Sequence, residues 1–449
     1  MTRNTVARYA IGSIGTAGFA TLPGLVLIYY LTDTLGVAAV VAGLIVAAAK
    51  IWDVVIDPVI GAASDRRALR LGSRRGMMLL GALALPVFFI ATFAVPGGVA
   101  SPLDALWVTV AFLIAATSFS LFQVPYIALP AELTDDYDQR TRLLTARVVV
   151  LTIGILAFGA GGPALRSIGE SPRMGYLVMA VVAALVIGVS LLIACGSAPR
   201  RAPQPAPSST ESATAAYRAA WAVLRRSRPL RMLLGAFLLQ GVATGLMLAD
   251  GQYIATWILG DEPAVSLLFV ALIAPALVFA PVWGRVARRI GKEAGFGGAT
   301  VVFIVATATL ILLRWSPGWW VYPVIGVAGA AYAGMQALPM AMLPDVISDD
   351  ERREGVGSAG VIGGVWTAGE TTGMAFGAVA LTALLAIGGY VSSDDTTAVI
   401  QPTPALTTMV LGFSVVPAAL AVMSLLLIRR YPLRRSDIDD VDERNSPRG

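Results

Sequence analysis

Twelve long apolar segments divide this chain of 449 residues, and they restrict its fold more than any other feature. A helix that crosses a bilayer needs roughly 20 mostly apolar residues. Only 14% of the residues are charged, against about a quarter in a soluble domain. The sequence therefore predicts an all-α membrane protein with twelve transmembrane helices. The predicted spans are 9–31, 38–60, 76–96, 105–129, 144–165, 173–195, 232–258, 264–284, 296–313, 319–343, 359–388 and 405–428.

Basic residues concentrate in alternate loops between these spans. One group follows the second span and another follows the eighth. Short loops rich in arginine and lysine stay in the cytoplasm. With an even number of spans, this bias predicts a multi-pass protein of the cell inner membrane with both termini in the cytoplasm. The two groups are Arg66, Arg67, Arg70, Arg74 and Arg75, and Arg285, Arg288, Arg289 and Lys292.

The rare residue types exclude several classes of protein. The chain has no histidine, and Cys195 is its only cysteine. Catalytic triads with histidine, His-containing zinc motifs and internal disulfides are therefore excluded. There is also no P-loop sequence for nucleotide binding. We expect a protein that is not an enzyme, has no cofactor, binds no nucleic acid and is a monomer. Its expected partners are the bilayer, a coupling cation and a small-molecule or amphiphilic substrate.

An internal repeat indicates two halves of six helices each. Pro125 and Pro130 end the fourth span and an Asp-Asp pair follows. At a constant offset, Pro339 and Pro344 end the tenth span and a second Asp-Asp pair follows. Such a repeat in two six-helix halves is typical of the major-facilitator architecture.

The stretch from Ala198 to Thr214 is rich in Pro, Ala and Ser, which is typical of a flexible linker. We predict an N-terminal half at 1–197, a cytoplasmic linker at 198–230, a C-terminal half at 231–430 and a cytoplasmic tail at 431–449. Within the linker, Trp221 and Leu224 alternate with arginines. This segment is either an interfacial amphipathic helix or a short solvated one.

Two carboxylates in the second span are the leading functional candidates, because ionisable residues in apolar spans are costly unless paired or hydrated. Asp53 and Asp57 are four residues apart and share one face of a helix. They repel each other unless a proton or a cation lies between them. We predict that the pair binds H⁺ or Na⁺. The alternative is a static salt bridge between Lys50 and Asp53, although one lysine cannot neutralise two carboxylates.

Other polar or aromatic residues inside the spans are candidates for a substrate site. Glu370 either lines the path or pairs with Arg147 or Lys50. The two aromatic candidates either stack on a sugar ring or simply pack. Asp250 either lines a path or marks where its helix opens to water. The predicted substrate-binding residues are Gln123, Tyr126, Arg147, Asp250, Trp366 and Glu370, and the predicted gating loop contains Asp65, Arg66, Arg74 and Arg75.

Several motifs together identify a family resemblance. The second span reads Lys-Ile-Trp-Asp53-Val-Val-Ile-Asp57-Pro-Val-Ile-Gly, and Val-Pro-Tyr126 and Glu132-Leu-Thr-Asp-Asp follow later. This pattern resembles the glycoside-pentoside-hexuronide:cation symporters, which are major-facilitator carriers typified by the melibiose permease. The resemblance implies that Asp53 and Asp57 bind the coupling cation and that Arg147 belongs to the sugar site.

The chain departs from that permease at four positions. Ile56 replaces an asparagine common in the family, Gln123 and Ala17 replace two aspartates, and Thr371 replaces a lysine. The cation pair is kept while the sugar clamp is not, which argues against a galactoside and favours H⁺ over Na⁺. We expect cation-coupled symport of a glycoside or related small solute by alternating access. The alternative is a carrier for lysophospholipids, other amphiphiles or drugs, since the same superfamily branch includes vertebrate lysophospholipid carriers.

Overall fold

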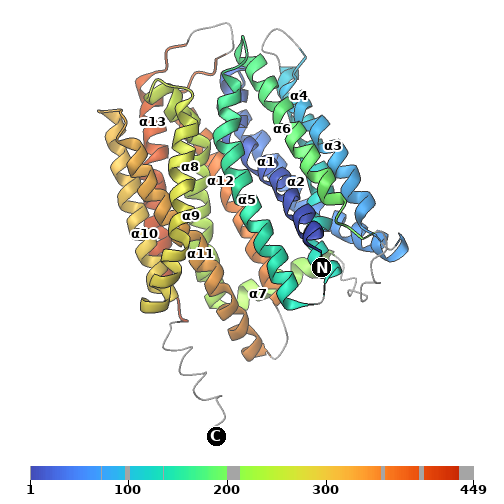
Figure 1. The fold of residues 1–449 in the computed structure, drawn as a ribbon. Coiled ribbons are helices and arrows are strands. Elements are labelled where there is room, and N and C mark those ends of the chain that lie inside the picture. Colours follow the sequence, from blue (N-terminus) through green and yellow to red (C-terminus); the bar gives the residue numbers. More distant parts are fainter. Residues whose placement is uncertain are drawn as a thin grey trace. The chain divides into compact units, whose positions relative to one another are not determined.

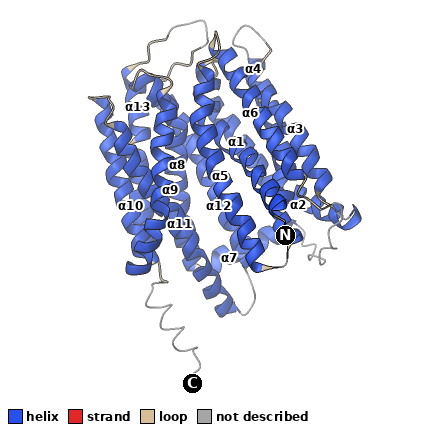
Figure 2. Cartoon of the chain, in the orientation of Figure 1, coloured by secondary structure: helices blue, strands red, loops and turns tan. Residues whose placement is uncertain are grey.

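The structure is a computed structural model that describes residues 2–71, 73–96, 102–134, 136–199, 213–354, 359–393 and 399–433. Its regular secondary structure in these ranges is helical (Figure 2). Within them, twelve helical segments are long and apolar enough to cross a membrane. Each overlaps one predicted span, so the predicted layout of twelve spans is confirmed. The largest differences lie at span ends, as at Arg3–Asp33, which extends beyond the predicted 9–31.

Contacts between Cα atoms divide the chain into two compact units. Unit 1 comprises Met1–Thr210 together with Gly389–Pro402, and unit 2 comprises Glu211–Gly388 together with Thr403–Gly449. The predicted limits of the two halves and of the linker stay predictions. The helices of unit 1, coloured blue to green in Figure 1, are α1 (Arg3–Asp33), α2 (Ala39–Leu71), α3 (Arg75–Phe93), α4 (Pro102–Leu133), α5 (Tyr137–Arg166) and α6 (Pro172–Cys195).

A segment from late in the sequence packs on the end of α1 and thereby belongs to unit 1. The Ser393 backbone N–H donates to the Thr32 carbonyl oxygen at 3.0 Å, and the Ser392 hydroxyl donates to the Val37 carbonyl oxygen at 2.8 Å. The Tyr390 hydroxyl donates to the Asp33 carboxylate. This segment lies inside the range that the sequence assigned to the C-terminal half.

Unit 2 contains the remaining helices of the described chain. One of them, α7, lies in the stretch predicted as a linker. Its Arg225 guanidinium lies 5.6 Å from the centre of the Trp221 ring, and Trp221 is 61% exposed. The elements of unit 2 are α7 (Ala213–Arg226), α8 (Arg228–Tyr253), η1 (Ile254–Ile258), α9 (Ala264–Ile290), α10 (Lys292–Thr309), η2 (Leu310–Arg314), α11 (Val321–Glu354), α12 (Ala359–Ile387), α13 (Thr403–Phe413) and α14 (Val415–Ile428).

Local sequence sets several helix starts. Ser171 accepts a hydrogen bond from the Met174 N–H at 3.3 Å at the start of α6, and Ser227 does the same for Leu230 at the start of α8. Proline follows each serine within two residues, where its missing N–H costs nothing. These starts therefore combine an N-cap side chain with a residue whose φ is already helical.

Glycines allow α8 and α12 to approach closely. Gly241 and Gly245 in α8 and Gly373 and Gly377 in α12 are each spaced as Gly-x-x-x-Gly. A Cβ atom at Gly245 would lie 2.6 Å from the Met374 carbonyl oxygen, closer than real side chains come. Small residues at this spacing let the backbones of membrane helices pack against each other. The two helices therefore form a tight pair within unit 2.

Candidate functional site

The two predicted cation ligands lie on α2 one turn apart. Lys50 Nζ lies 3.5 Å from Asp53 Oδ2, so the predicted salt bridge is present. The two carboxylates are close enough for their charges to repel, and Asp57 faces the hydroxyl of Ser120 on α4. Each carboxylate has one buried oxygen without a hydrogen-bond partner among the described residues. Even with Lys50 in place, each acid therefore keeps one carboxylate oxygen that can accept a hydrogen bond or bind a cation.

Helix α4 packs beside α2 and supports this pair. The Trp52 indole N–H donates to the Thr117 hydroxyl at 2.8 Å, which fixes the register of the two helices near the carboxylates. The oxygen ligands available to a cation here are two carboxylates and one hydroxyl. Hard oxygen ligands of this kind suit H⁺ or Na⁺. In the described part of the chain, no group of three or more Asp, Glu, Cys or His side chains converges as a metal cluster would.

Tyr126 is the centre of a buried polar cluster between α1, α4 and α5. Its hydroxyl donates to the Tyr9 carbonyl oxygen at 2.6 Å and lies 3.0 Å from the Ser13 hydroxyl. Its ring stacks on Tyr9, with ring centres 4.6 Å apart, and on Phe122, with ring centres 5.1 Å apart. Tyr126 is 0% exposed. The structure therefore supports the packing alternative for this residue over stacking on a sugar.

Arg147 of α5 meets this cluster from the side. Its guanidinium carbon lies 5.3 Å from the centre of the Tyr126 ring, and it faces the Tyr9 hydroxyl. The buried Nε atom of Arg147 has no hydrogen-bond partner in the described chain. Within the described part of unit 1, Arg147 and a carboxylate form no ion pair. The guanidinium is thus held by aromatic contacts and retains donors for an anionic ligand.

Gln123 lies on α4 one turn before Tyr126. Its Oε1 atom is buried and has no hydrogen-bond partner among the described residues. An unpaired buried amide is costly, so this position fits a polar ligand site better than a packing position. In unit 1, Arg147 therefore contacts Tyr126, and Gln123 lies one turn before Tyr126 on the same helix.

The remaining substrate candidates lie in unit 2. Trp366 of α12 is 2% exposed and stacks on Phe237 of α8, with ring centres 4.4 Å apart, which supports its packing alternative. Glu370, one turn later, is half-buried and lies near Tyr332 of α11. Its predicted role in lining a path or pairing with a unit 1 cation stays a prediction.

Asp250 lies near the end of α8 and is 0% exposed. The alternative in which its helix opens to water at this point is wrong for this structure, because the side chain reaches no solvent. Its predicted contact with a substrate stays a prediction.

The residues of the predicted gating loop lie at the end of α2 and the start of α3. Asp65 and Arg66 belong to the last two turns of α2, so the prediction of a loop at these two positions is wrong. Arg74 directly precedes α3, and Arg75 is its first residue. The Arg74 Nη1 donates to the Ser64 hydroxyl at 3.1 Å, and its Nε pairs with the Glu132 carboxylate at the end of α4. Arg66 is exposed, whereas Arg75 is half-buried. The side chain of Asp65 lies outside what the structure describes. The Arg74–Glu132 pair joins the start of α3 to the end of α4, which is the contact that a latch requires.

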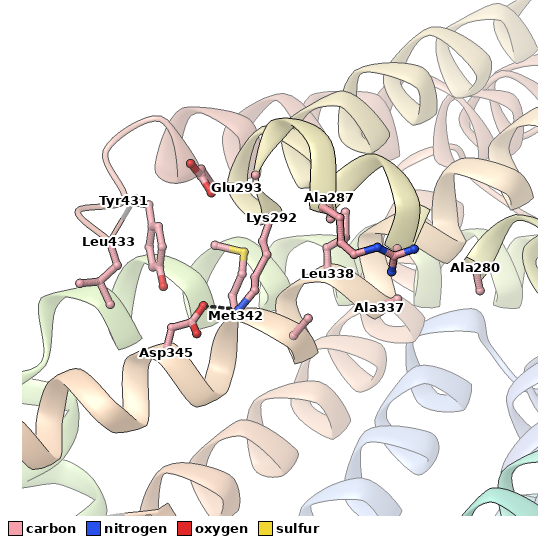
Figure 3. A pocket seen from close by; sticks show the side chains of 14 residues that line it. Ala280, Ala287, Lys292, Glu293, Ala337, Leu338, Met342, Asp345, Tyr431 and Leu433 are labelled. Carbon is pink, nitrogen blue, oxygen red and sulfur yellow. Dashed lines mark hydrogen bonds and ion pairs between the residues drawn. The ribbon is translucent and has the colours of Figure 1, made fainter. Parts of the chain in front are cut away.

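A comparable ion pair closes one side of a cavity in unit 2. The cavity, of about 570 Å³, lies between the ends of α9, α10 and α11 and the stretch after α14. Lys292 Nζ lies 2.7 Å from Asp345 Oδ2 there (Figure 3). Tyr431, beside them, is buried after the last membrane span. Its burial raises the pKa of the Tyr431 phenol, and the negative charges of Asp345, Asp349 and Glu293 raise this pKa further.

Two polar contacts in unit 2 were not predicted from the sequence. Arg226 at the end of α7 binds Asp350 at the end of α11 through two hydrogen bonds, of 3.1 and 2.6 Å. The Gln240 amide donates to the hydroxyls of Thr300 and Ser424, at 3.0 Å each. A glutamine inside an apolar span was a visible signal for the second contact. The first joins residues 124 apart and depends on tertiary structure.

Comparisons with known proteins agree with this geometry. The family model described as MFS/sugar transport protein matches residues 8–435. The glucuronide carrier protein homolog of Escherichia coli (strain K12) is 24% identical over 436 residues, covering 96% of this chain and 92% of that protein. The isoprimeverose transporter of Lactiplantibacillus pentosus is 21% identical over 441 residues, covering 94% and 87%.

A solved structure shows the same fold. The xylose transporter XylE from E. coli, in a partially occluded inward open conformation, aligns with a TM-score of 0.62 at 12% identity, covering 96% of this chain and 99% of that chain. The predicted family resemblance is confirmed, and the relatives are membrane transporters rather than enzymes. This chain is a multi-pass membrane protein that belongs to the MFS/sugar transport protein family.

Proposed function

We propose that this protein is a secondary transporter that couples the movement of an anionic glycoside to a cation gradient. The observation that carries the proposal is the pair of carboxylates on α2. Asp53 and Asp57 share one lysine, and each keeps a buried oxygen without a partner among the described residues. Two carboxylates with unpaired oxygens inside a membrane span cost free energy when no cation is bound. Binding of a cation would supply the positive charge that Lys50 alone does not provide.

The coupling ion that we propose is H⁺. A proton needs only one carboxylate, whereas Na⁺ needs several oxygen ligands around it. The side chains near the pair offer the two carboxylates and the Ser120 hydroxyl, and Ile56 contributes no oxygen. This ligand set satisfies a proton more readily than Na⁺.

The substrate that we propose carries a negative charge, such as the carboxylate of a hexuronide. Arg147 has a buried donor without a partner in the described chain, and neither position 17 nor position 123 carries an acid, since Ala17 and Gln123 stand there. A carboxylate that binds the guanidinium would gain a charge-assisted hydrogen bond. A relative named as a glucuronide carrier protein homolog supports the same class.

The membrane orientation that we propose follows from the arginine bias. The basic segment with Arg66, Arg74 and Arg75 faces the cytoplasm, and so do both termini of the chain. We further propose that the protein works as a monomer in the inner membrane by alternating access.

Uptake into proteoliposomes tests the mechanism. The purified protein is reconstituted, and entry of radiolabelled methyl β-glucuronide is measured under a pH gradient or a Na⁺ gradient. We expect accumulation with the pH gradient in the absence of Na⁺. Asp53→Asn and Asp57→Asn should each abolish accumulation but leave exchange down the substrate gradient. Asp261→Asn, which changes an exposed acid outside the spans, serves as the control and should transport normally.

Three results would change the proposal. Gradient-driven accumulation by the Asp53→Asn, Asp57→Asn double variant would refute a role for the pair in coupling. If Asp53→Asn lowers the melting temperature while Asp57→Asn is silent in every assay, the static salt bridge with Lys50 is the better description. Uptake of a lysophospholipid but not of any glycoside would replace the proposed substrate with the amphiphilic alternative.

A further inference from the structure

Asp250 is a carboxylate enclosed inside unit 2, apart from the residues that the proposed function uses. Both of its carboxylate oxygens are buried and have no hydrogen-bond partner among the described residues. Gly412 of α13 gives the carboxylate its space, because a Cβ atom there would lie 2.9 Å from Asp250 Oδ2. The same Cβ position is 3.4 Å from Leu384 of α12, so an apolar side chain lies on this side of the acid.

The backbone beside Asp250 is also irregular. The Ile254 N–H reaches both the Asp250 and the Gly251 carbonyl oxygens, and the π-helical turn η1 starts at Ile254. Single π-helical turns occur frequently at functional sites. Across from η1, the helix of the last span breaks at Ser414 between α13 and α14. The acid therefore lies where two membrane spans depart from regular α-helix.

No charged side chain of the described residues forms a hydrogen bond with this carboxylate. On α8 itself, Arg231 lies 19 residues earlier in the sequence, which is about 28 Å along the helix axis. On α12, Glu370 is 14 residues before Leu384, or about 21 Å along that axis. The segments η1, α13 and α14 have no ionisable side chain. Arg314 of η2 packs on α13, but its Nε donates to the Thr407 hydroxyl at 3.2 Å, five residues before Gly412. On α8, Tyr253 follows one turn later and Arg228 lies further away than Arg231, and Asp261 and Glu262 follow η1.

A buried carboxylate in these surroundings has two ways to avoid the cost of its charge. One is a counter-ion, but no side chain of the described residues pairs with either carboxylate oxygen, and the acid belongs to no described cluster that could hold a metal. The other is a proton, which makes the group neutral and needs no additional ligand. Only the second fits the site.

We propose that Asp250 is a proton-binding site of unit 2, separate from the carboxylate pair on α2, and that its carboxyl group is neutral in the folded protein. The site takes one proton from water as unit 2 folds. Unfolding exposes the group, which then releases this proton at any pH well above about 4, the ordinary value for aspartate. The folded protein therefore holds one more proton than the unfolded chain, and its stability falls as the pH rises.

The melting temperature of the full chain in detergent tests this site without any transport assay. Asp250→Asn keeps the shape of the neutral acid but cannot release a proton. We expect it to match the wild type to within about 1 °C near pH 4 and to exceed it at higher pH by a margin that grows by about 3 °C for each pH unit. Asp261→Asn, the exposed acid beyond η1, should follow the wild type at every pH.

Infrared spectroscopy provides a second measurement. At neutral pH, the difference between the wild type and Asp250→Asn should contain the carbonyl stretch of a protonated carboxylic acid, missing in the variant. A margin that does not change with pH would overturn the proposal, as would an Asp250→Asn chain that fails to fold at pH 5 or a difference spectrum without that band. These results are independent of Asp53 and Asp57, so the site on α2 stands or fails separately.

Discussion

The pair formed by Arg74 and Glu132 should contribute strongly to the stability of unit 1. Both side chains are 10% exposed, and Arg74 also donates to the Ser64 hydroxyl. Removing one charge from a buried pair strands the other, which costs about 3–5 kcal/mol. Because this pair lies at helix ends, we expect the lower end of that range for Glu132→Gln. For a unit of this size, such a loss corresponds to a fall in melting temperature of about 6–12 °C.

A double-mutant cycle separates the pair from the individual residues. Thermal and chemical unfolding are followed for Glu132→Gln, Arg74→Gln and the double variant. Arg66→Gln, which changes an exposed arginine near the end of α2, serves as the control. The double variant has lost both charges of the pair. Its loss in free energy of unfolding should therefore be about 2 kcal/mol smaller than the sum of the losses in the two single variants. Arg66→Gln should change the free energy of unfolding by less than about 0.5 kcal/mol. Additive effects of the two single variants would refute the argument that the ions stabilise each other.

Four further predictions follow from other parts of the molecule. Gln123→Ala should weaken glucuronide binding in titration calorimetry more than it lowers the melting temperature, and unchanged affinity with lost stability would make this amide a packing residue. Gly245→Ala should lower the free energy of unfolding by about 1–3 kcal/mol, because its Cβ would meet the α12 backbone, whereas Gly251→Ala, whose Cβ would lie 4.0 Å from the nearest atom, should be neutral. Because the pKa of Tyr431 is raised, the folded protein keeps a proton that the unfolded chain loses, and its stability falls as the pH rises above about 10. In melting curves recorded over a pH series, Tyr431→Phe should lose less stability in this range than the wild type does. A reporter fused after Gly449 should be active in the cytoplasm and one inserted between α12 and α13 should be active outside, and activity on the same side would refute the predicted orientation.

The long apolar runs of the sequence were sufficient to predict the membrane helices. Each span is a run of apolar residues whose length is fixed by the bilayer, so the signal is local and does not depend on tertiary contacts. The acids on α2 were also predictable, because a charge inside an apolar run is conspicuous and four-residue spacing places both on one face. The contact between Lys50 and Asp53 was predictable from their separation of three residues, and the distance of 3.5 Å agrees with it.

Long-range contacts were beyond that reasoning. Tyr126 was a candidate for stacking on a sugar, but its ring is covered by Tyr9, which is 117 residues away in the sequence. The pairing of Arg226 with Asp350 has no local signal, since each residue is unremarkable within its own basic or acidic segment. Such contacts depend on which helices become neighbours, and periodicity alone does not specify this.

The two units differ in chemistry more than in framework. Each has an ion pair that joins the connection after its second long span to the end of its fourth, Arg74 with Glu132 in unit 1 and Lys292 with Asp345 in unit 2. Pro58-Val-Ile-Gly61 of α2 resembles Pro281-Val-Trp-Gly284 of α9. The same offset places Ala276 and Ala280 of α9 where α2 has its two acids. The framework is therefore repeated while the carboxylate pair is not. A feature required by the fold would be expected in both units, so the pair on α2 is better explained by ion binding than by helix packing.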